Sequence, residues 1–249
     1  MFQYVIESDT GKIRLVNEDS VAVLKRTDGL MLAIVADGMG GHKAGDVASK
    51  MTVDQLSQFF LEDEDEAFLT LDSKRKWLSE RIKTINRSVY DHASANPECK
   101  GMGTTLIAAL IKGFEGVLCH IGDSRAYLIG DSIKQLTRDH SYVNVLVDSG
   151  EISQEEAEEH PKKNWIVRAL GTESRIEREI IDFSLADDPY LLMCSDGLSN
   201  KIPKEEIASV VRSASPLSQK GQELVNLAND LGGEDNISLI LLSSMDKEV

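Results

Sequence analysis

Four aspartates of this chain stand beside glycines at the ends of apolar runs. Asp37 and Asp196 are each followed by a glycine, and Asp123 directly follows one. Asp235 comes shortly after a pair of glycines and leads into the apolar run 237–242. A single Asp-Gly pair usually marks a turn. Four such places beside core strands indicate that these carboxylates converge, provided that the strands are neighbours.

Converging carboxylates predict a cation site. Several carboxylates close together repel one another, and they remain ionised only if cations neutralise them. Oxygen ligands without histidine or cysteine select hard ions such as Mg²⁺ or Mn²⁺ rather than zinc. A pair of such ions performs hydrolysis because it lowers the pKa of a bound water towards neutrality. The residues alone therefore indicate a metal-dependent hydrolase.

The elements that would position these aspartates follow from the apolar pattern. Near-continuous apolar runs predict strands buried on both faces at 30–36, 116–121, 190–194 and 237–242. Further strands are expected at 2–7, 20–24, 103–112, 125–129, 132–136 and 178–183, and helices at 43–60, 74–94, 204–213 and 217–231. Sheets that need cover on both sides, and four helices to supply it, predict an α/β fold with helices outside and sheets inside.

The stretch 139–171 differs from the rest of the chain. It is polar and has little core-forming periodicity. Ser153 and Glu156 form a capping-box pattern that predicts a short helix at 154–159, after another helix at 141–149. We therefore expect one domain over residues 1–249, with 139–171 as a small helical insertion on its rim. The acidic run 62–66 is expected to be a solvated loop.

Charge and cysteine content exclude several classes of protein. With 27 basic and 42 acidic residues the net charge is −15, which disfavours nucleic acid and anionic membrane as partners. No run approaches the roughly 20 apolar residues of a membrane span, and the first residues lack a secretory signal pattern. Cys99, Cys119 and Cys194 are expected to be buried free thiols, with a disulfide as the less favoured alternative. The expected location is the cytoplasm.

A set of motifs in a fixed order extends over residues 5–242. The motifs are Gly11-x-x-Arg14-x-x-Asn17-Glu18-Asp19, Asp37-Gly38-Met39-Gly40-Gly41, Gly103-Thr104-Thr105, Gly122-Asp123-Ser124-Arg125-Ala126, Ser195-Asp196-Gly197-Leu198 and Asp235-Asn236. Each motif is weak alone, but the ordered set resembles the PP2C-like, metal-dependent serine/threonine protein phosphatases of the bacterial single-domain type. The resemblance implies an αββα fold, a central antiparallel β-sandwich flanked by helices on both sides, with 139–171 as the family's flap.

The resemblance also implies a set of metal ligands. Asp37 would bridge two Mn²⁺ or Mg²⁺ ions, and the Gly38 carbonyl would ligate one of them. Asp196 and Asp235 would complete the protein ligands of the first ion, and Asp123 would help Asp196 to bind a third, weaker ion. From the second shell, Glu18 and Asp19 would hold metal-bound waters.

Substrate binding and proton transfer involve other residues of the motifs. Arg14 would bind the substrate phosphate, because its planar guanidinium can pair with two phosphate oxygens. Many eukaryotic relatives have a histidine, thought to protonate the leaving group, where this chain has Met39, so the general acid is left open between a metal-bound water and His42. His42 itself is more simply a loop residue, and His120 a core histidine.

The resulting prediction is a phosphatase that hydrolyses phosphoserine and phosphothreonine by direct attack of a metal-activated water. Phosphoproteins and the opposing Ser/Thr kinases are the expected partners, and the protein is expected to be a monomer. Two alternatives are a non-catalytic phosphoprotein-binding module and a metal-dependent phosphatase of small metabolites. The intact aspartate set argues against the first, and the insertion at 139–171 gives no support to the second.

Overall fold

Two antiparallel sheets packed face to face form the centre of the molecule. The structure is a computed structural model that describes residues 2–40 and 44–244. One sheet has the strand order β1-β11-β10-β7-β8, and the other has the order β2-β3-β5-β6-β9, with β4 paired to β3. The strands are β1 (Gln3–Asp9), β2 (Asp19–Lys25), β3 (Met31–Met39), β4 (Gly103–Thr104), β5 (Leu106–Lys112), β6 (Glu115–Ile121), β7 (Arg125–Ile129), β8 (Ile133–Gln135), β9 (Glu179–Ser184), β10 (Tyr190–Cys194) and β11 (Ile237–Ser243).

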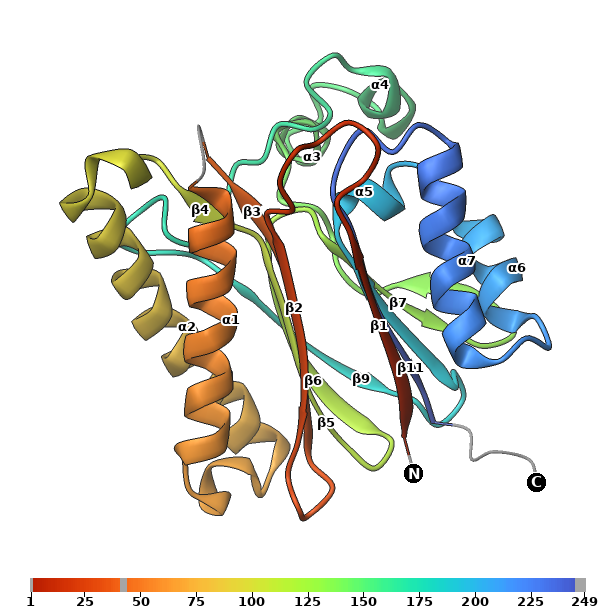
Figure 1. Ribbon diagram of the computed structural model, residues 1–249, viewed down its shortest axis with the longest axis horizontal. Coiled ribbons are helices and arrows are strands. Elements are labelled where there is room, and N and C mark those ends of the chain that lie inside the picture. Colours follow the sequence, from red (N-terminus) through yellow and green to blue (C-terminus); the bar gives the residue numbers. More distant parts are fainter. Residues whose placement is uncertain (1, 41–43, 245–249) are drawn as a thin grey trace.

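Helices cover both outer faces of this sandwich. In Figure 1, α1 (Gly45–Glu62) and α2 (Leu71–Ala95) cover the sheet that contains β3, while α6 (Lys204–Arg212) and α7 (Leu217–Asp230) cover the other sheet. Three apolar clusters fill the interfaces, one between the two sheets and one beneath each helix pair. The predicted α/β fold with an αββα sandwich is confirmed. Among the described helices, none has the length and apolar character needed to cross a membrane.

The strand β3 illustrates why its sequence is apolar at every position. Leu32, Ile34 and Ala36 pack under α1 and α2, whereas Met31 and its alternate neighbours face the opposite sheet. Side chains alternate along a strand, so a strand in the middle of four layers needs apolar residues on both of its faces.

The expected end of β3 and the expected strand 103–112 were both wrong in detail. Residues 103–112 form two strands, β4 and β5, which both pair with β3 and are separated at Thr105. The short strand β4 pairs with Gly38 and Met39, so β3 continues through Asp37 and Gly38 instead of turning there. Asp37 is thus held in a strand, where long-range pairing overrides the turn preference of Asp-Gly.

The helices agree with the sequence except near their ends. α2 begins at Leu71, three residues before the expected start, because Thr70 and Ser73 form a capping box. The expected first residue of α1 lies outside the described residues. The acidic run was expected to be a loop, but a short 3₁₀ helix begins within it at Asp65. The one-turn helix α5 (Asp196–Ser199) was not predicted.

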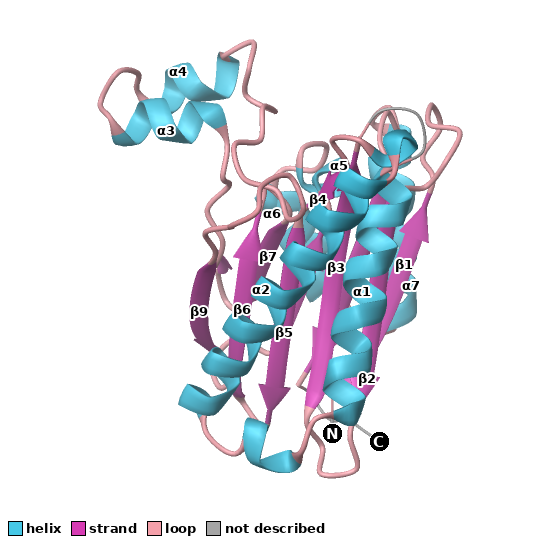
Figure 2. Cartoon of the chain, turned by 90° about the vertical axis from the view of Figure 1, so that its left-hand side faces the viewer, coloured by secondary structure: helices cyan, strands magenta, loops and turns pink. Residues whose placement is uncertain are grey.

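The polar stretch 139–171 contains α3 (Tyr142–Asp148) and α4 (Gln154–Glu159). Both helices project beyond one end of the sandwich, as Figures 1 and 2 show. The predicted capping box of Ser153 and Glu156 is present at α4. The three cysteines are free and buried, as expected.

Candidate metal centre

The carboxylates singled out in the sequence surround one cavity at the end of the sandwich next to α5. This cavity has a volume of about 250 Å³. Its lining comprises Arg14, Glu18, Asp37, Gly38, Met39, Gly40, Asp123, Asn164, Ile166, Asp196 and Asp235. The predicted convergence of the four aspartates is therefore observed.

Both sheets contribute to this cavity. Asp37 lies in β3, opposite Asp19 of β2 in the antiparallel register. Asp123 follows β6, and in the other sheet Asp196 follows β10 as the first residue of α5. Asp235 precedes β11. Because each aspartate stands at the same end of its strand pair, the packing of the two sheets brings the acids together.

Two glycines allow the backbones to approach closely enough for this arrangement. A Cβ atom on Gly38 would lie 2.1 Å from the carbonyl oxygen of Gly45, and one on Gly197 would lie 2.0 Å from that of Asn236. Both distances are far below van der Waals contact with backbone atoms. The glycine after Asp37 and the glycine after Asp196 are thus required by packing rather than by a turn.

Hydrogen bonds from neighbouring side chains fix the backbone around the acids. The amide of Asp37 donates to Thr105 Oγ1 at 3.0 Å, and Ser195 Oγ donates to Asp19 Oδ2 at 2.8 Å. Asn236 accepts from the Glu18 amide at 2.8 Å. It also donates to the carbonyl of Val16 at 3.0 Å. The positions of the carboxylates are therefore set before any cation binds.

Burial and mutual repulsion raise the pKa values of these carboxyls. Desolvation is the largest cause for Asp37, Asp123 and Asp196, and the charges of neighbouring aspartates add to it. For Asp19, desolvation raises the pKa to about 7 against the lowering effect of the Ser195 hydrogen bond. Without a cation, the cluster therefore holds protons that exposed carboxyls would lose at neutral pH.

The donor set fits Mn²⁺ or Mg²⁺. Among the described residues that line the cavity, the groups able to ligate an ion are carboxylate, amide and carbonyl oxygens, with no imidazole or thiolate. Asp19 Oδ1 and Asp123 Oδ1 are buried and accept no hydrogen bond from the described part of the chain. A buried carboxyl oxygen that receives no hydrogen bond can ligate a hard divalent ion. The same ion can replace the protons that these carboxyls hold without a cation.

The other predicted site residues lie around this cluster. Arg14 lines the cavity, and its Nη2 donates to Asp235 Oδ2 at 2.8 Å, with about half of the Arg14 side chain exposed. Burial raises the pKa of Glu18, whose carboxyl accepts a hydrogen bond from the Gly45 backbone. Met39 lines the cavity and has no proton to donate. His42 lies outside the described residues.

The structure adds residues that the sequence did not indicate. Asn164 and Ile166, both from the stretch 139–171, line the cavity. No motif marks them, and their proximity depends on how that stretch returns to the sandwich. His120 is fully buried, as expected, but it lies beside His140 and Glu179 rather than among apolar side chains alone.

Comparison with known proteins places this arrangement in a family. The sequence model for protein phosphatase 2C matches residues 12–234. The serine/threonine phosphatase stp of Listeria monocytogenes is 42% identical over 238 residues, which is 94% of this chain and 93% of that protein. The crystal structure of serine/threonine phosphatase Stp1 from Staphylococcus aureus has 37% identity and a TM-score of 0.93, covering 99% of this chain and 96% of that one.

A further solved structure contains metal. The catalytic domain of serine threonine protein phosphatase PstP, in complex with two manganese ions, has 33% identity and a TM-score of 0.82. The match covers 98% of this chain and 99% of that one. The chain therefore belongs to the protein phosphatase 2C family, the metal-dependent serine/threonine phosphatases.

Proposed function

We propose that the chain dephosphorylates phosphoserine and phosphothreonine in proteins at the cavity between its two sheets. The observation that carries this proposal is the cluster of carboxylates around that cavity. Burial and neighbouring charges raise the pKa values of Asp37 and Asp123, and Asp123 Oδ1 is buried without a donor from the described residues. Such a cluster has no structural advantage, because it repels itself in the folded state. Cation binding explains why the fold retains it.

Each acid has a distinct part in holding the metals. Asp37 lies among the other acids and would bridge two Mn²⁺ or Mg²⁺ ions, with the Gly38 carbonyl as a further ligand. Asp196 and Asp235 would complete the first ion's protein ligands. Glu18 and Asp19 would orient waters through hydrogen bonds. When bound, the ions supply positive charge beside the phosphate and acidify a water to a pKa near neutrality.

Arg14 would bind the substrate phosphate. Its guanidinium pairs with Asp235, and a cation held by Asp235 would compete for that carboxyl group. Arg14 can then leave the Asp235 carboxyl and bind the substrate phosphate, because its planar guanidinium can donate to two phosphate oxygens at once. This pairing also keeps the guanidinium at the mouth of the cavity before substrate arrives.

The surroundings of the cavity favour a protein substrate over a small metabolite. A larger cavity of about 940 Å³ shares Asp123, Asn164, Asp196 and Asp235 with the metal centre. It is lined on one side by 139–171 and on the other by the segment 196–205. We infer that 139–171 acts as a flap inserted in a single domain of residues 1–249, and that the chain flanking the phosphorylated residue occupies this cleft.

Several finer assignments follow from the same reasoning. Serine/threonine kinases in the same cell would supply the phosphoproteins. The buried free thiols support a reducing compartment, the cytoplasm, as the place of action. The protein would act as a monomer. A non-catalytic binding module would not need the complete acid set, and this favours an enzyme.

Metal removal tests the function itself. We expect EDTA to abolish phosphate release from a phosphothreonine peptide, and Mn²⁺ or Mg²⁺ to restore it. Asp37→Ala and Asp196→Ala should each lose at least about 100-fold in rate while still folding, since metal charge stabilisation amounts to several kcal/mol. Phosphate release measured after exhaustive chelation would refute the metal mechanism if it persisted.

The pH dependence of stability tests the carboxylate cluster without any activity assay. A carboxyl whose folded pKa is raised stabilises the fold below its unfolded pKa, and this stability is lost as pH rises through the folded value. For Asp19 the window runs from about pH 4 to about pH 7. The metal-free protein should therefore unfold at lower temperature at pH 8 than at pH 5.5, and Mn²⁺ should reverse the difference. Asp37→Asn should flatten the metal-free dependence; an equally steep one would mean that the cluster does not repel itself.

Arg14 can be tested through substrate binding. A hydrogen bond to a charged group contributes roughly 1.5–3 kcal/mol, so Arg14→Ala should raise KM or the inhibition constant of phosphate about 10- to 150-fold. Arg14→Lys should recover only part of this loss. Calorimetric binding of Mn²⁺ to the first sites should change little. If Arg14→Ala has the kinetics of the wild-type protein, Arg14 is a surface residue that does not bind the substrate phosphate.

Asp123 is expected to support protonation of the departing oxygen, which Met39 cannot perform. Asp123→Asn removes one charge and keeps the shape, so the central ions should still bind. We expect kcat on a phosphoserine peptide to fall about 10²- to 10⁴-fold, the usual contribution of general acid catalysis. An activated aryl phosphate needs no protonation of its leaving group and should be affected far less. An equal fall on both substrates would exclude Asp123 from proton transfer.

A further inference from the structure

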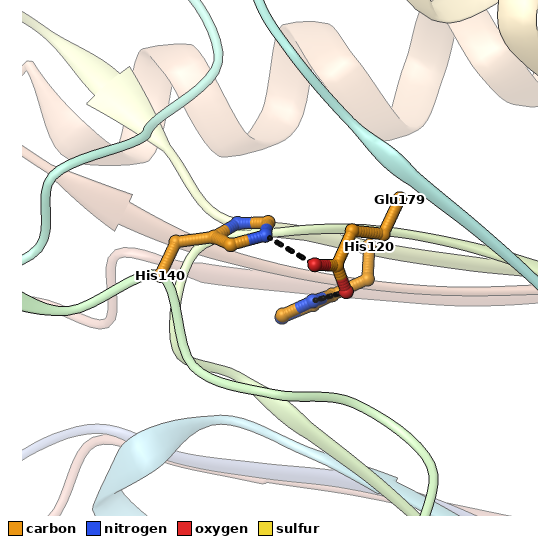
Figure 3. A group of neighbouring side chains, drawn as sticks. All are labelled: His120, His140 and Glu179. Atoms are coloured by element: carbon orange, nitrogen blue, oxygen red, sulfur yellow. Dashed lines mark ion pairs between the residues drawn. The ribbon is translucent and has the colours of Figure 1, made fainter. Parts of the chain in front are cut away.

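A second cluster of ionisable groups, two buried histidines and a partly exposed glutamate, lies at the base of the flap, apart from the metal centre. It consists of His120 from β6, His140 from the start of the flap and Glu179 from β9 (Figure 3). His140 Nε2 lies 3.4 Å from Glu179 Oε1, and His120 Nδ1 lies 3.8 Å from Glu179 Oε2. Both imidazoles are buried. Two histidines and a carboxylate at this spacing have the composition of a transition-metal site.

The hydrogen bonds of His140 contradict a metal site. The amide of Gly122 donates to His140 Nδ1 at 3.0 Å, so Nδ1 presents its lone pair there. A neutral imidazole has one protonated nitrogen, and in His140 this must be Nε2, which faces Glu179. A protonated Nε2 cannot ligate an ion. The rings of His120 and His140 also stack, with centroids 4.7 Å apart and planes at 26°, so their lone pairs do not converge on one point.

His140 instead connects three parts of the chain. Its amide donates to the carbonyl of Gly122 at 2.8 Å, and its carbonyl accepts from the amide of Val167 at 2.9 Å. Together with the side-chain bond from Gly122, these contacts join the start of the flap, its return and the loop after β6. Gly122 has φ of +104°, and a Cβ there would lie 2.7 Å from Thr105, so this loop has little freedom of its own. The next residue is Asp123.

We propose that His140 is a positioning residue: in its Nε2–H tautomer, with Nε2 directed at Glu179, its Nδ1 holds the Gly122 amide and thereby fixes both Asp123 and the two ends of the flap. This inference rests on the proposed roles of Asp123 and of the flap. His140 acts through backbone contacts and does not touch the substrate.

The surroundings maintain the required charge states. Burial, and then the neighbouring His120, lower the pKa of His140, which keeps its ring neutral. The facing imidazoles, His120 first and then His140, lower the pKa of Glu179 to about 2, so that Glu179 stays an acceptor. The adjacent Asp139 pairs with Arg125 at 2.7 Å, and Arg125 donates to the Ser199 carbonyl in α5 at 3.1 Å. The flap base is thus tied to the helix that begins with Asp196.

The first test observes the tautomer directly. Imidazole ¹⁵N shifts of the five histidines, measured in the full chain with EDTA and with Mg²⁺, should identify His140 as the Nε2–H tautomer in both conditions. An Nδ1–H tautomer would overturn the proposal. So would a shift of His140 typical of metal ligation on addition of Zn²⁺. This measurement needs no phosphatase activity, so failure of the proposed function would leave its result intact.

The second test compares a variant that can still accept the hydrogen bond from Gly122 with one that cannot. Asparagine can place its Oδ1 near the position of Nδ1 and accept from Gly122, whereas leucine cannot. His140→Leu should lower the ratio of kcat/KM on a phosphopeptide to that on an aryl phosphate about tenfold, the effect of one buried hydrogen bond. His140→Asn should keep most of the ratio. His160→Leu is the matched control, because His160 Nδ1 also accepts a backbone amide, that of Lys162, but within the flap.

Flap position gives a readout that is independent of turnover. Trp165 lies in the flap and is 57% exposed, so its fluorescence in a Trp77→Phe background reports the flap alone. His140→Leu should change the quenching of Trp165 by acrylamide, and His140→Asn should not. Equal behaviour of the two variants in both assays would overturn the proposal. If His140→Leu does not fold, the tautomer measured in the wild-type protein and the substrate ratio measured for His140→Asn still decide the proposal.

Discussion

Electrostatic repulsion between buried carboxylates is the constraint on which the rest of this structure depends. Asp19, Asp37, Asp123 and Asp196 have raised pKa values because they are desolvated and face one another. A chain free to relax would separate them. The fold prevents this by anchoring each acid to a strand or helix whose other residues lie in the apolar core. Stability in the sandwich thus offsets strain at its end, and bound cations remove that strain.

The residues that hold the acids in place are small and polar. Thr105 fixes the backbone of Asp37 and Ser195 fixes the side chain of Asp19. Asn236 ties the loop that carries Arg14 to the strand that follows Asp235, through the carbonyls of Thr10 and Val16. Arg14, which we propose to bind the phosphate, and Asp235 therefore belong to one hydrogen-bonded unit, although they stand at opposite ends of the chain.

The sequence predicts the parts of the site that depend on local pattern. The apolar runs identify strands buried on both faces, and the acids beside them identify the site. It does not predict that β3 continues through Asp37, because the partner β4 lies far away in the chain. Nor does it predict Asn164 at the cavity, since the path of 139–171 depends on a few bridges such as Thr104 to Leu170. His140 has no local signal, because its role lies in contacts with Gly122, Val167 and Glu179.

Under the proposed role of 139–171 as a flap, the way this stretch is attached separates chemistry from specificity. The metal centre is built from both sheets and cannot change without disturbing the core beneath it. The flap instead joins the sandwich at its base, through backbone bonds and through the side chains of His140 and Asp139, and contributes Asn164 and Ile166 to the cavity rim. Substitutions on its exposed surface, including Trp165, leave those bonds intact. A flap held in this manner can adopt new substrate contacts while the acids keep the geometry that hydrolysis requires, provided that the link from His140 to Gly122 is retained.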